Sequence, residues 1–149
     1  GAVFVFQERV CQGGALIRIA KFRSLRVHGR EQVTRVGGLL RTTRIDELPQ
    51  LWSVFSGKQS LIGPRPELPE YVKLYNEQIP YYNVRHLIKP GLSGWAQIQN
   101  IVPPKFGVQY DATKQKLSYD LYYVKHRSLW LDLKIALKTI KTLLSRSGI

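Results

Sequence analysis

An Asp-Glu pair among arginines is the feature of this sequence best suited to chemistry. Asp46 and Glu47 are adjacent, Arg41 and Arg44 precede them, and Arg65 follows between two prolines. Guanidinium groups and a helix N-terminus both favour the carboxylate form, and an ionised carboxylate can attack phosphorus or bind a divalent cation. Two adjacent acids can divide those tasks. The pattern therefore suits metal-assisted phosphoryl chemistry, although ordinary helix capping also produces an acidic first turn.

The run Gly63-Pro64-Arg65-Pro66 favours the chemical interpretation over capping. A proline fixes its own φ and restricts the residue before it, so the backbone around Arg65 has few conformations. A guanidinium on such a loop loses little entropy when it binds the paired oxygens of a phosphate. Lys21, Arg23 and Arg26 form a basic cluster that could close the same anion site, or they are simply solvated charges.

Other kinds of catalytic or metal site have no support in the sequence. The usual glycine-rich phosphate-binding motifs, the serine-hydrolase motif and the zinc-protease motif are all absent. The three histidines, His28, His86 and His126, have no metal-ligand spacing, so each is interpreted as a surface or packing residue. Cys11 is the single cysteine and cannot form an internal disulfide, which fits a reducing compartment.

The composition indicates one folded, strongly basic domain over residues 1–149. The chain has 23 Lys and Arg against 10 Asp and Glu, a formal net charge of +13. With 44% hydrophobic and 11% aromatic residues it can bury a core, which argues against disorder. The charge implies a polyanionic partner, and composition alone leaves nucleic acid, anionic lipid and phosphorylated substrate open.

The pattern of the whole sequence predicts an α+β fold around these residues. Residues 2–10 and 15–22 predict an N-terminal β-hairpin, residues 23–37 a polar loop, and a short helix begins at Asp46 and stops at Gly57. Several short helices and rigid Pro/Gly loops follow. We expect helices over 68–78, 81–87, 112–124 and 129–144, rigid loops over 60–66 and 89–95, and irregular chain over 100–111. No segment is apolar for long enough to span a membrane.

The C-terminal segment 129–144 predicts a basic amphipathic helix. Its apolar stripe consists of Leu129, Leu133, Leu137, Ile140 and Leu144, and its basic stripe of Lys134, Lys138 and Lys141. Such a helix can lie in a membrane interface with its lysines at the headgroups. It can equally pack the apolar stripe on the protein's own core with the lysines in solvent, which is the interpretation we favour from sequence. The two are compatible.

Three long motifs resemble one protein family. The segments 44–52 (RIDELPQLW), 60–67 (SLIGPRPE) and 89–97 (KPGLSGWAQ) resemble the bacterial sugar transferases. These are monotopic phosphoglycosyl transferases, which begin the assembly of exopolysaccharide, O-antigen and glycoprotein glycans on polyprenyl phosphate. Shorter matches at 7–10, 21–24, 119–124 and 131–134 extend the resemblance over nearly the whole chain. The segment 98–110 differs from small family members, and 111–124 is closer to the large exopolysaccharide-initiating ones.

The resemblance implies a reaction and a set of site residues. Family members transfer a sugar 1-phosphate from a nucleotide diphosphate sugar, usually a UDP-sugar, to undecaprenyl phosphate. The reaction releases UMP and requires Mg²⁺. By this resemblance Asp46 would be the nucleophile that forms a phosphosugar-enzyme intermediate, and Glu47 would act beside it and ligate Mg²⁺. The implied phosphate-binding or substrate-lining residues are Lys21, Arg41, Arg65, Gln97 and Asp120.

The resemblance also implies a place in the cell, the cytoplasmic face of the bacterial inner membrane. Family members carry a hydrophobic membrane helix before the hairpin, whereas this sequence begins after that point and has no Met. We therefore expect a catalytic domain without its membrane anchor and with little turnover by itself. The alternatives are a non-catalytic basic module that binds anionic lipid or nucleic acid, and a regulatory remnant of the family. The intact motifs weigh against the remnant, and nucleic acid becomes the least expected partner.

Overall fold

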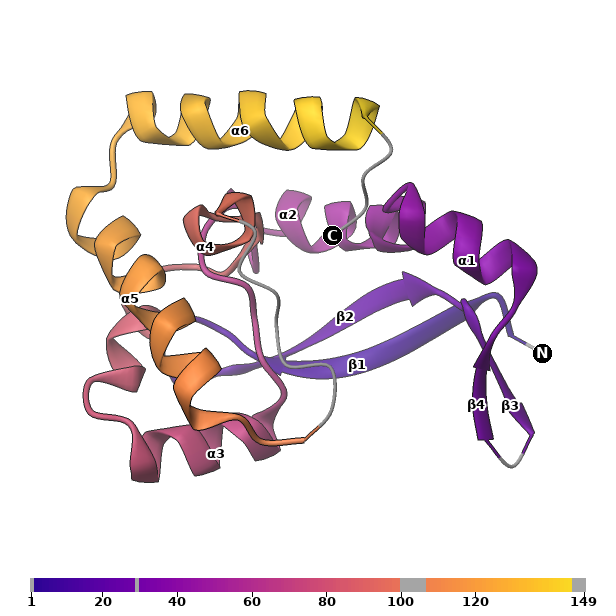
Figure 1. The fold of residues 1–149 in the computed structure, drawn as a ribbon, viewed down its shortest axis with the longest axis horizontal. Coiled ribbons are helices and arrows are strands. Elements are labelled where there is room, and N and C mark those ends of the chain that lie inside the picture. The colour runs from indigo at the N-terminus through magenta and orange to yellow at the C-terminus, as the bar shows by residue number, and fades with distance from the viewer. Residues whose placement is uncertain (1, 29, 100–106, 146–149) are drawn as a thin grey trace.

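The computed structural model describes residues 2–28, 30–99 and 107–145 of the chain (Figure 1). Within these residues helices are joined to three two-stranded sheets, which confirms the predicted α+β class. The helical elements are η1 (Gln12–Gly14), α1 (Arg35–Thr42), η2 (Ile45–Gln50), α2 (Leu51–Phe55), α3 (Pro69–Gln78), η3 (Tyr82–Leu87), α4 (Trp95–Ile98), α5 (Tyr110–His126) and α6 (Leu129–Leu144).

The predicted N-terminal hairpin is confirmed. Strands β1 (Phe4–Val10) and β2 (Leu16–Phe22) pair antiparallel, with Phe4 opposite Phe22 and Val10 opposite Leu16. Glycines at 13 and 14 have φ of 68° and 80°, a region that favours glycine, and they turn the chain within η1. Strand β2 packs against η2. The hairpin thereby brings Lys21 to the Asp46-Glu47 segment.

The predicted loop over 23–37 is wrong. Strands β3 (Leu25–His28) and β4 (Arg30–Val33) form a second antiparallel hairpin, and α1 begins directly after it. The Oγ1 of Thr34 accepts a hydrogen bond of 2.8 Å from the amide of Gly37, a standard N-cap. Strands of four residues are too short to show a clear period among so many charges. Arg41 therefore lies on a helix, α1, that leads into the acidic pair.

The two predicted Pro/Gly loops are joined by a parallel strand pair that the sequence did not indicate. Strand β5 (Ser60–Ile62) pairs with β6 (Gly91–Ser93), and the amide of Gly63 donates to the carbonyl of Ser93 at 2.8 Å. A Cβ placed on Gly91 would lie 2.1 Å from the amide nitrogen of Gly63, so only glycine permits this approach. The two loops are therefore held to each other as one unit.

The remaining helices lie close to the predicted positions. The helix expected to begin at Asp46 starts as the 3-10 helix η2 and continues as α2, which ends before Gly57, where φ is 76°. The predictions over 68–78, 81–87, 112–124 and 129–144 correspond to α3, η3, α5 and α6 and are confirmed. Residues 100–106 of the predicted irregular stretch 100–111 lie outside the described residues, and the prediction is wrong for Tyr110 and Asp111, which form the start of α5.

Two apolar clusters anchor these helices. One is formed by β1, α3, η3 and α5, and it contains Val10, Val72, Tyr75, Ile79, Tyr82 and Leu117. The other joins α4, α5 and α6 through Ile98, Tyr123 and Ile135. Helix α6 is thus attached to the domain along one side of its surface, centred on the fully buried Ile135.

The apolar stripe of α6 does not pack on the core, so the interpretation we favoured from sequence is wrong. Leu129 is 89% exposed, and the other members of the stripe are exposed as well. The helix instead turns Ile135, with Leu131 packed beside it, towards the protein. It therefore has two apolar sides, and the periodic pattern alone does not tell which of them is buried.

Exposed apolar side chains also extend from α1 and α2, which lie with α6 on the same side of the β1–β2 hairpin (Figure 1). They include Val36 and Leu39 on α1, and Trp52 and Phe55 on α2. Among the described residues, no helix has both the length and the apolar character needed to cross a bilayer. These exposed apolar side chains on α1, α2 and α6 therefore belong to short helices that lie along one side of the domain.

Candidate active site

Glu47 is the centre of an ion-pair cluster built from separate elements. Its Oε1 accepts from Lys21 Nζ on β2 at 3.1 Å and from Arg65 Nη2 on the Pro-Arg-Pro loop at 2.8 Å. Its Oε2 pairs with Arg44 Nη1 at 3.5 Å. The structure thus brings together three residues that the sequence proposed for this site, Lys21, Glu47 and Arg65.

The surrounding cations keep Glu47 ionised. Burial by itself would raise the pKa of this carboxyl, but Arg65, Lys21 and Arg44 outweigh burial and lower the pKa to about 2. Glu47 is therefore a carboxylate at every physiological pH. It also holds the three basic side chains close together, where an incoming phosphate can meet them.

Asp46 is the less satisfied of the two acids. Its side chain is buried, and its Oδ1 has no hydrogen-bond partner within the described part of the chain. Burial and the charge of Glu47 raise the pKa of Asp46, against the opposing effects of Lys21, Arg41 and Arg44. From sequence we expect the guanidinium groups to favour the carboxylate form of both acids. For the direction of the pKa shift this expectation is wrong at Asp46 and right at Glu47. The Asp46 oxygen keeps its lone pairs available to a phosphorus atom or a cation.

Two arginines on the N-terminal side of the acids have different environments. Arg44 adopts a left-handed backbone, with φ of 59°, where α1 gives way to η2. Arg41 is exposed, and its Nε donates to Ser24 Oγ at 3.0 Å. The choice of site residues from sequence omitted Arg44, although its position three residues before Glu47 is typical of a helical ion pair.

The remaining predicted site residues lie in different places. Gln97, on α4, lines a cavity beside Glu47. Asp120 has no described hydrogen bond or ion pair with the acidic pair. Its Oδ2 accepts from Arg85 Nε at 3.1 Å, and Arg85 in turn donates to the carbonyl of Arg65. From the basic cluster proposed after the hairpin, Lys21 reaches Glu47, whereas Arg23 donates to the carbonyl of Ala2 at 2.7 Å.

The histidines described with side chains lie apart from this cluster. The ring of His86 packs edge-on against Tyr82, and burial and Arg85 lower its pKa to about 4. The ring of His126 stacks on Tyr122, with ring centroids 4.2 Å apart. Both contacts agree with the interpretation of these two histidines as packing residues.

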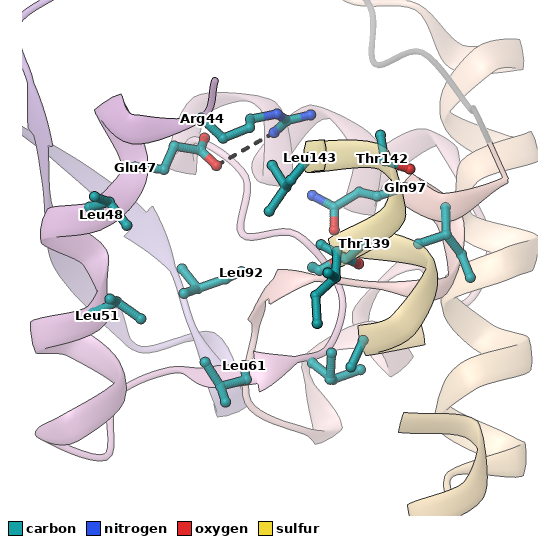
Figure 2. Close-up of a pocket in the computed structure, with 15 residues that line it drawn as sticks. Arg44, Glu47, Leu48, Leu51, Leu61, Leu92, Gln97, Thr139, Thr142 and Leu143 are labelled. Carbon is teal, nitrogen blue, oxygen red and sulfur yellow. Dashed lines mark hydrogen bonds and ion pairs between the residues drawn. The ribbon is translucent and has the colours of Figure 1, made fainter. Parts of the chain in front are cut away.

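An apolar cavity of about 300 Å³ opens beside Glu47 (Figure 2). Its acidic and basic end is formed by Glu47 and Arg44, whose ion pair lies at the margin of the cavity in Figure 2. The rest of the wall is mainly aliphatic and comes from η2, α2, β5, β6, α4 and α6. The apolar lining residues are Leu48, Leu51, Leu61, Ile62, Leu92, Ile98, Ala136, Ile140 and Leu143. The cavity therefore suits an amphiphile with an anionic head.

The acidic pair can hold a metal ion only together with a ligand. Within the residues that the structure describes, no group of three or more His, Cys, Asp or Glu side chains is arranged to bind a metal. Mg²⁺ commonly takes one or two protein carboxylates and completes its shell with water and substrate phosphates. The Asp46 Oδ1 without a partner and the Glu47 Oε2, whose ion pair is the longest of the three, fit that mode. Magnesium at Glu47 stays a prediction.

The local charge is suited to a diphosphate. Lys21, Arg44 and Arg65 contact Glu47, and Arg41 lies near enough to lower the pKa of Asp46, so the cations outnumber the acids. Arginine binds phosphate oxygens with paired donors, and this attraction strengthens where water is partly excluded. The arrangement can therefore hold a diphosphate beside the available Asp46 oxygen.

Comparison with known proteins places this site in a family context. Residues 1–146 match the family model described as bacterial sugar transferase. The chain is 43% identical, over 99% of its length, to the UDP-N-acetylgalactosamine-undecaprenyl-phosphate N-acetylgalactosaminephosphotransferase of Aeromonas hydrophila, of which the match covers 37%. It is 36% and 37% identical to UDP-glucose:undecaprenyl-phosphate glucose-1-phosphate transferases of Xanthomonas campestris and Caulobacter vibrioides, over 93% and 97% of this chain and 31% and 58% of those proteins. The chain thus spans about a third to somewhat over half of these relatives.

Proposed function

Because this chain belongs to the bacterial sugar transferase family, we propose that it transfers a sugar 1-phosphate from a UDP-sugar to undecaprenyl phosphate and releases UMP. The observation that carries the proposal is the buried Asp46 oxygen without a partner, next to a glutamate held by three cations. The relatives' names, which specify UDP-sugars and undecaprenyl phosphate, support the same substrate classes.

In the proposed first step, Asp46 attacks the sugar-side phosphorus of the donor. A bond forms between the carboxylate oxygen and phosphorus, and the bond from phosphorus to the bridging oxygen breaks, so that UMP leaves. Negative charge grows on the departing oxygen, and fixed guanidinium groups such as Arg65 and Arg44 stabilise it. Mg²⁺ held by Glu47 would neutralise part of the charge on the diphosphate oxygens.

In the second step, an oxygen of the lipid phosphate attacks the phosphorus of the phosphosugar on Asp46. The bond between this phosphorus and Asp46 breaks, the carboxylate returns, and the product is a lipid diphosphate sugar. The cavity supports a lipid acceptor, because it is aliphatic and has Glu47 and Arg44 at one margin. Its wall includes Leu48 and Leu51 from one side and Leu143 from α6 (Figure 2).

The side of the domain formed by α1, α2 and α6 is the proposed membrane-facing side. Trp52 is 78% exposed, and the apolar stripe of α6 lies uncovered along the same side. Lys134, Lys138 and Lys141 are exposed on α6 and can reach anionic headgroups. Aromatic and basic side chains are typical of the interface between membrane and water. The proposed location is the cytoplasmic face of the bacterial inner membrane, and the proposed role is the first step of exopolysaccharide or related glycan assembly.

The non-catalytic alternative, a basic module that binds anionic lipid or nucleic acid, is not favoured. Binding by net charge alone would give no role to a buried Asp46 beside Glu47. Substitution of either acid would then leave the binding unchanged. The relatives named above differ in the sugar that they transfer, so the proposal stops at the class of UDP-sugar.

The test is an assay of UMP release in membranes from cells that express the protein, with a panel of UDP-sugars and undecaprenyl phosphate. We expect Asp46→Asn to lower turnover at least about 1000-fold, as loss of a nucleophile does. Asp111→Asn, an exposed acid at the start of α5, is the matched control and retains activity. Unchanged UMP release from Asp46→Asn would refute the proposed nucleophile.

A further inference from the structure

We propose that Arg85 is a positioning residue for Arg65. Its guanidinium, oriented by Asp120 and Tyr82, fixes the backbone of the Pro-Arg-Pro loop so that the side chain of Arg65 reaches Glu47 and the donor's phosphates. The inference deepens the proposed function and rests on it for the identity of the ligand. It assigns Asp120 a role that does not involve touching substrate.

The loop is held through its carbonyl groups. Proline has no N–H, so Pro64 and Pro66 can be fixed by backbone hydrogen bonds only as acceptors. Four consecutive carbonyls each receive a donor from elsewhere in the chain. The bonds are Gly91 N to Pro64 O at 3.0 Å, Arg85 Nη2 to Arg65 O at 2.6 Å, Arg9 Nη1 to Pro66 O at 3.4 Å, and Val10 N to Glu67 O at 2.9 Å.

Arg85 makes the shortest of these four bonds, to the carbonyl of Arg65, the central residue of the Pro-Arg-Pro loop. Its side chain is 2% exposed, so the charge lies away from water. A hydrogen bond from a buried guanidinium to a carbonyl is strengthened by the charge and by the low local dielectric. The carbonyl that it fixes belongs to the residue whose side chain donates to Glu47 at 2.8 Å. Any rotation of that peptide unit would therefore move the Arg65 side chain.

The guanidinium of Arg85 is itself held on its other sides. Nε donates to Asp120 Oδ2 at 3.1 Å, Nη2 lies 3.0 Å from the same oxygen, and Nη1 donates to Tyr82 Oη at 3.1 Å. Asp120 is also 2% exposed and supplies the negative charge that a buried arginine requires. A planar group held at three nitrogens has one orientation, which a lysine amine could not reproduce.

A hydroxyl on the same helix provides a matched control. Tyr123 lies one helical turn from Asp120 along α5, is 2% exposed, and donates from Oη to Asp132 Oδ1 at 2.5 Å. It has no hydrogen bond to Arg85, Arg65 or Glu67 among the described contacts. Tyr123→Phe removes a buried hydroxyl, as Tyr82→Phe does, but leaves every bond to the loop in place. The comparison separates positioning from general stability.

The experiment measures the affinity for UDP and the release of UMP by the wild-type protein and by Arg85→Lys and Asp120→Asn. We expect each variant to bind UDP at least about tenfold more weakly and to lose about 10- to 100-fold in kcat/KM, as small displacements of a binding group do. Tyr123→Phe should lower the temperature of thermal inactivation and leave both constants within about twofold. Tyr82→Phe, a milder change that keeps the aromatic ring, should give a smaller loss in the same direction.

A double-mutant cycle with Arg65→Ala gives the decisive readout. If Arg85 acts through Arg65, Arg85→Lys should lower UDP affinity less than about twofold in the Arg65→Ala background, where its target is gone. The inference would be overturned by the same fold loss in both backgrounds. It would also be overturned by an equal loss of affinity in Tyr123→Phe, or by a wild-type protein that does not bind UDP. A wild-type protein that binds UDP but releases no UMP from any donor would refute the proposed function while the cycle still measures the positioning of Arg65.

Discussion

Arg65 donates from Nη2 to Glu47 Oε1 at 2.8 Å, across a separation of 18 residues. This contact joins the acidic pair at the start of η2 to the Pro-Arg-Pro loop, and Lys21 on β2 shares the same glutamate oxygen. Three separate segments thus meet at one carboxylate. The proximity of the acids to the phosphate-binding arginine is a property of the folded chain, because neither motif contains the other.

The ionisation of Glu47 should make stability depend on pH. Its pKa is about 2 in the folded protein and has an ordinary value of 4.5, so the folded state binds protons less readily. The stabilisation is therefore fully present above about pH 4.5 and is lost as the pH falls towards 2, with a magnitude of roughly 3 kcal/mol. Urea unfolding of the wild type and Glu47→Gln between pH 7 and pH 2.5 measures it. A stability difference between the two that stays constant over this range would contradict the prediction.

The loss of activity at low pH should reflect the protonation of Asp46. Burial and Glu47 raise the pKa of Asp46, so kcat/KM should fall, as the pH is lowered, at a pH above the ordinary aspartate value of 3.8. Arg44 opposes that rise, and Arg44→Gln should therefore move the loss of activity to higher pH. The pH profile of UMP release measures both effects, with Lys58→Gln, an exposed cation, as the control. A loss of activity that moves to lower pH in Arg44→Gln would contradict the assignment.

Filling the apolar cavity should impair the lipid acceptor and spare the donor. Leu143 lines the cavity from α6, whereas the next residue, Leu144, is 79% exposed and does not line it. We expect Leu143→Trp to raise the KM for undecaprenyl phosphate about tenfold, because the lost apolar contact is worth about 1.4 kcal/mol or more. Leu144→Trp is the matched control. Release of UMP in the first turnover, without acceptor, should be unchanged in both, and an equal effect of the two variants on KM would argue against the cavity.

The exposed stripe of α6 should bind membranes. Leu137→Glu places a charge where we expect lipid. The loss of an apolar contact of about 2 kcal/mol should weaken binding to anionic vesicles at least about tenfold. Lys138→Glu should weaken it several-fold, since each basic residue near such a surface contributes about 1 kcal/mol. Vesicle sedimentation measures both, with Gln115→Glu on the exposed side of α5 as control. Equal binding by wild type and Leu137→Glu would exclude α6 from the membrane contact.

The site was predictable where the residue type itself carries the chemistry. Asp46, Glu47 and Arg65 stand out because adjacent acids and a proline-flanked arginine are unusual, and the hairpin that carries Lys21 has a clear turn. Arg85 could not be found in this way. Its role depends on a hydrogen bond to a carbonyl 20 residues earlier and on Asp120, 35 residues later, and a lone arginine in a helical turn has no pattern that reveals such partners.

The fold was predictable where a period extends over several turns. Helix α6 lies where its pattern placed it, over Leu129–Leu144. The buried side of this helix was not predictable, because Leu131 and Ile135 form a second apolar side. That side is buried because it packs against α4 and α5. Strands β5 and β6 have three residues each, too few for an alternation to be seen.

The phosphosugar on Asp46 can be detected through the intact mass of the protein after incubation with UDP-sugar and Mg²⁺ without lipid acceptor. We expect a gain equal to one sugar phosphate, located at Asp46 by peptide mapping, absent from Asp46→Asn and lost when undecaprenyl phosphate is added. UMP release with no covalent adduct, or an adduct on another residue, would contradict it.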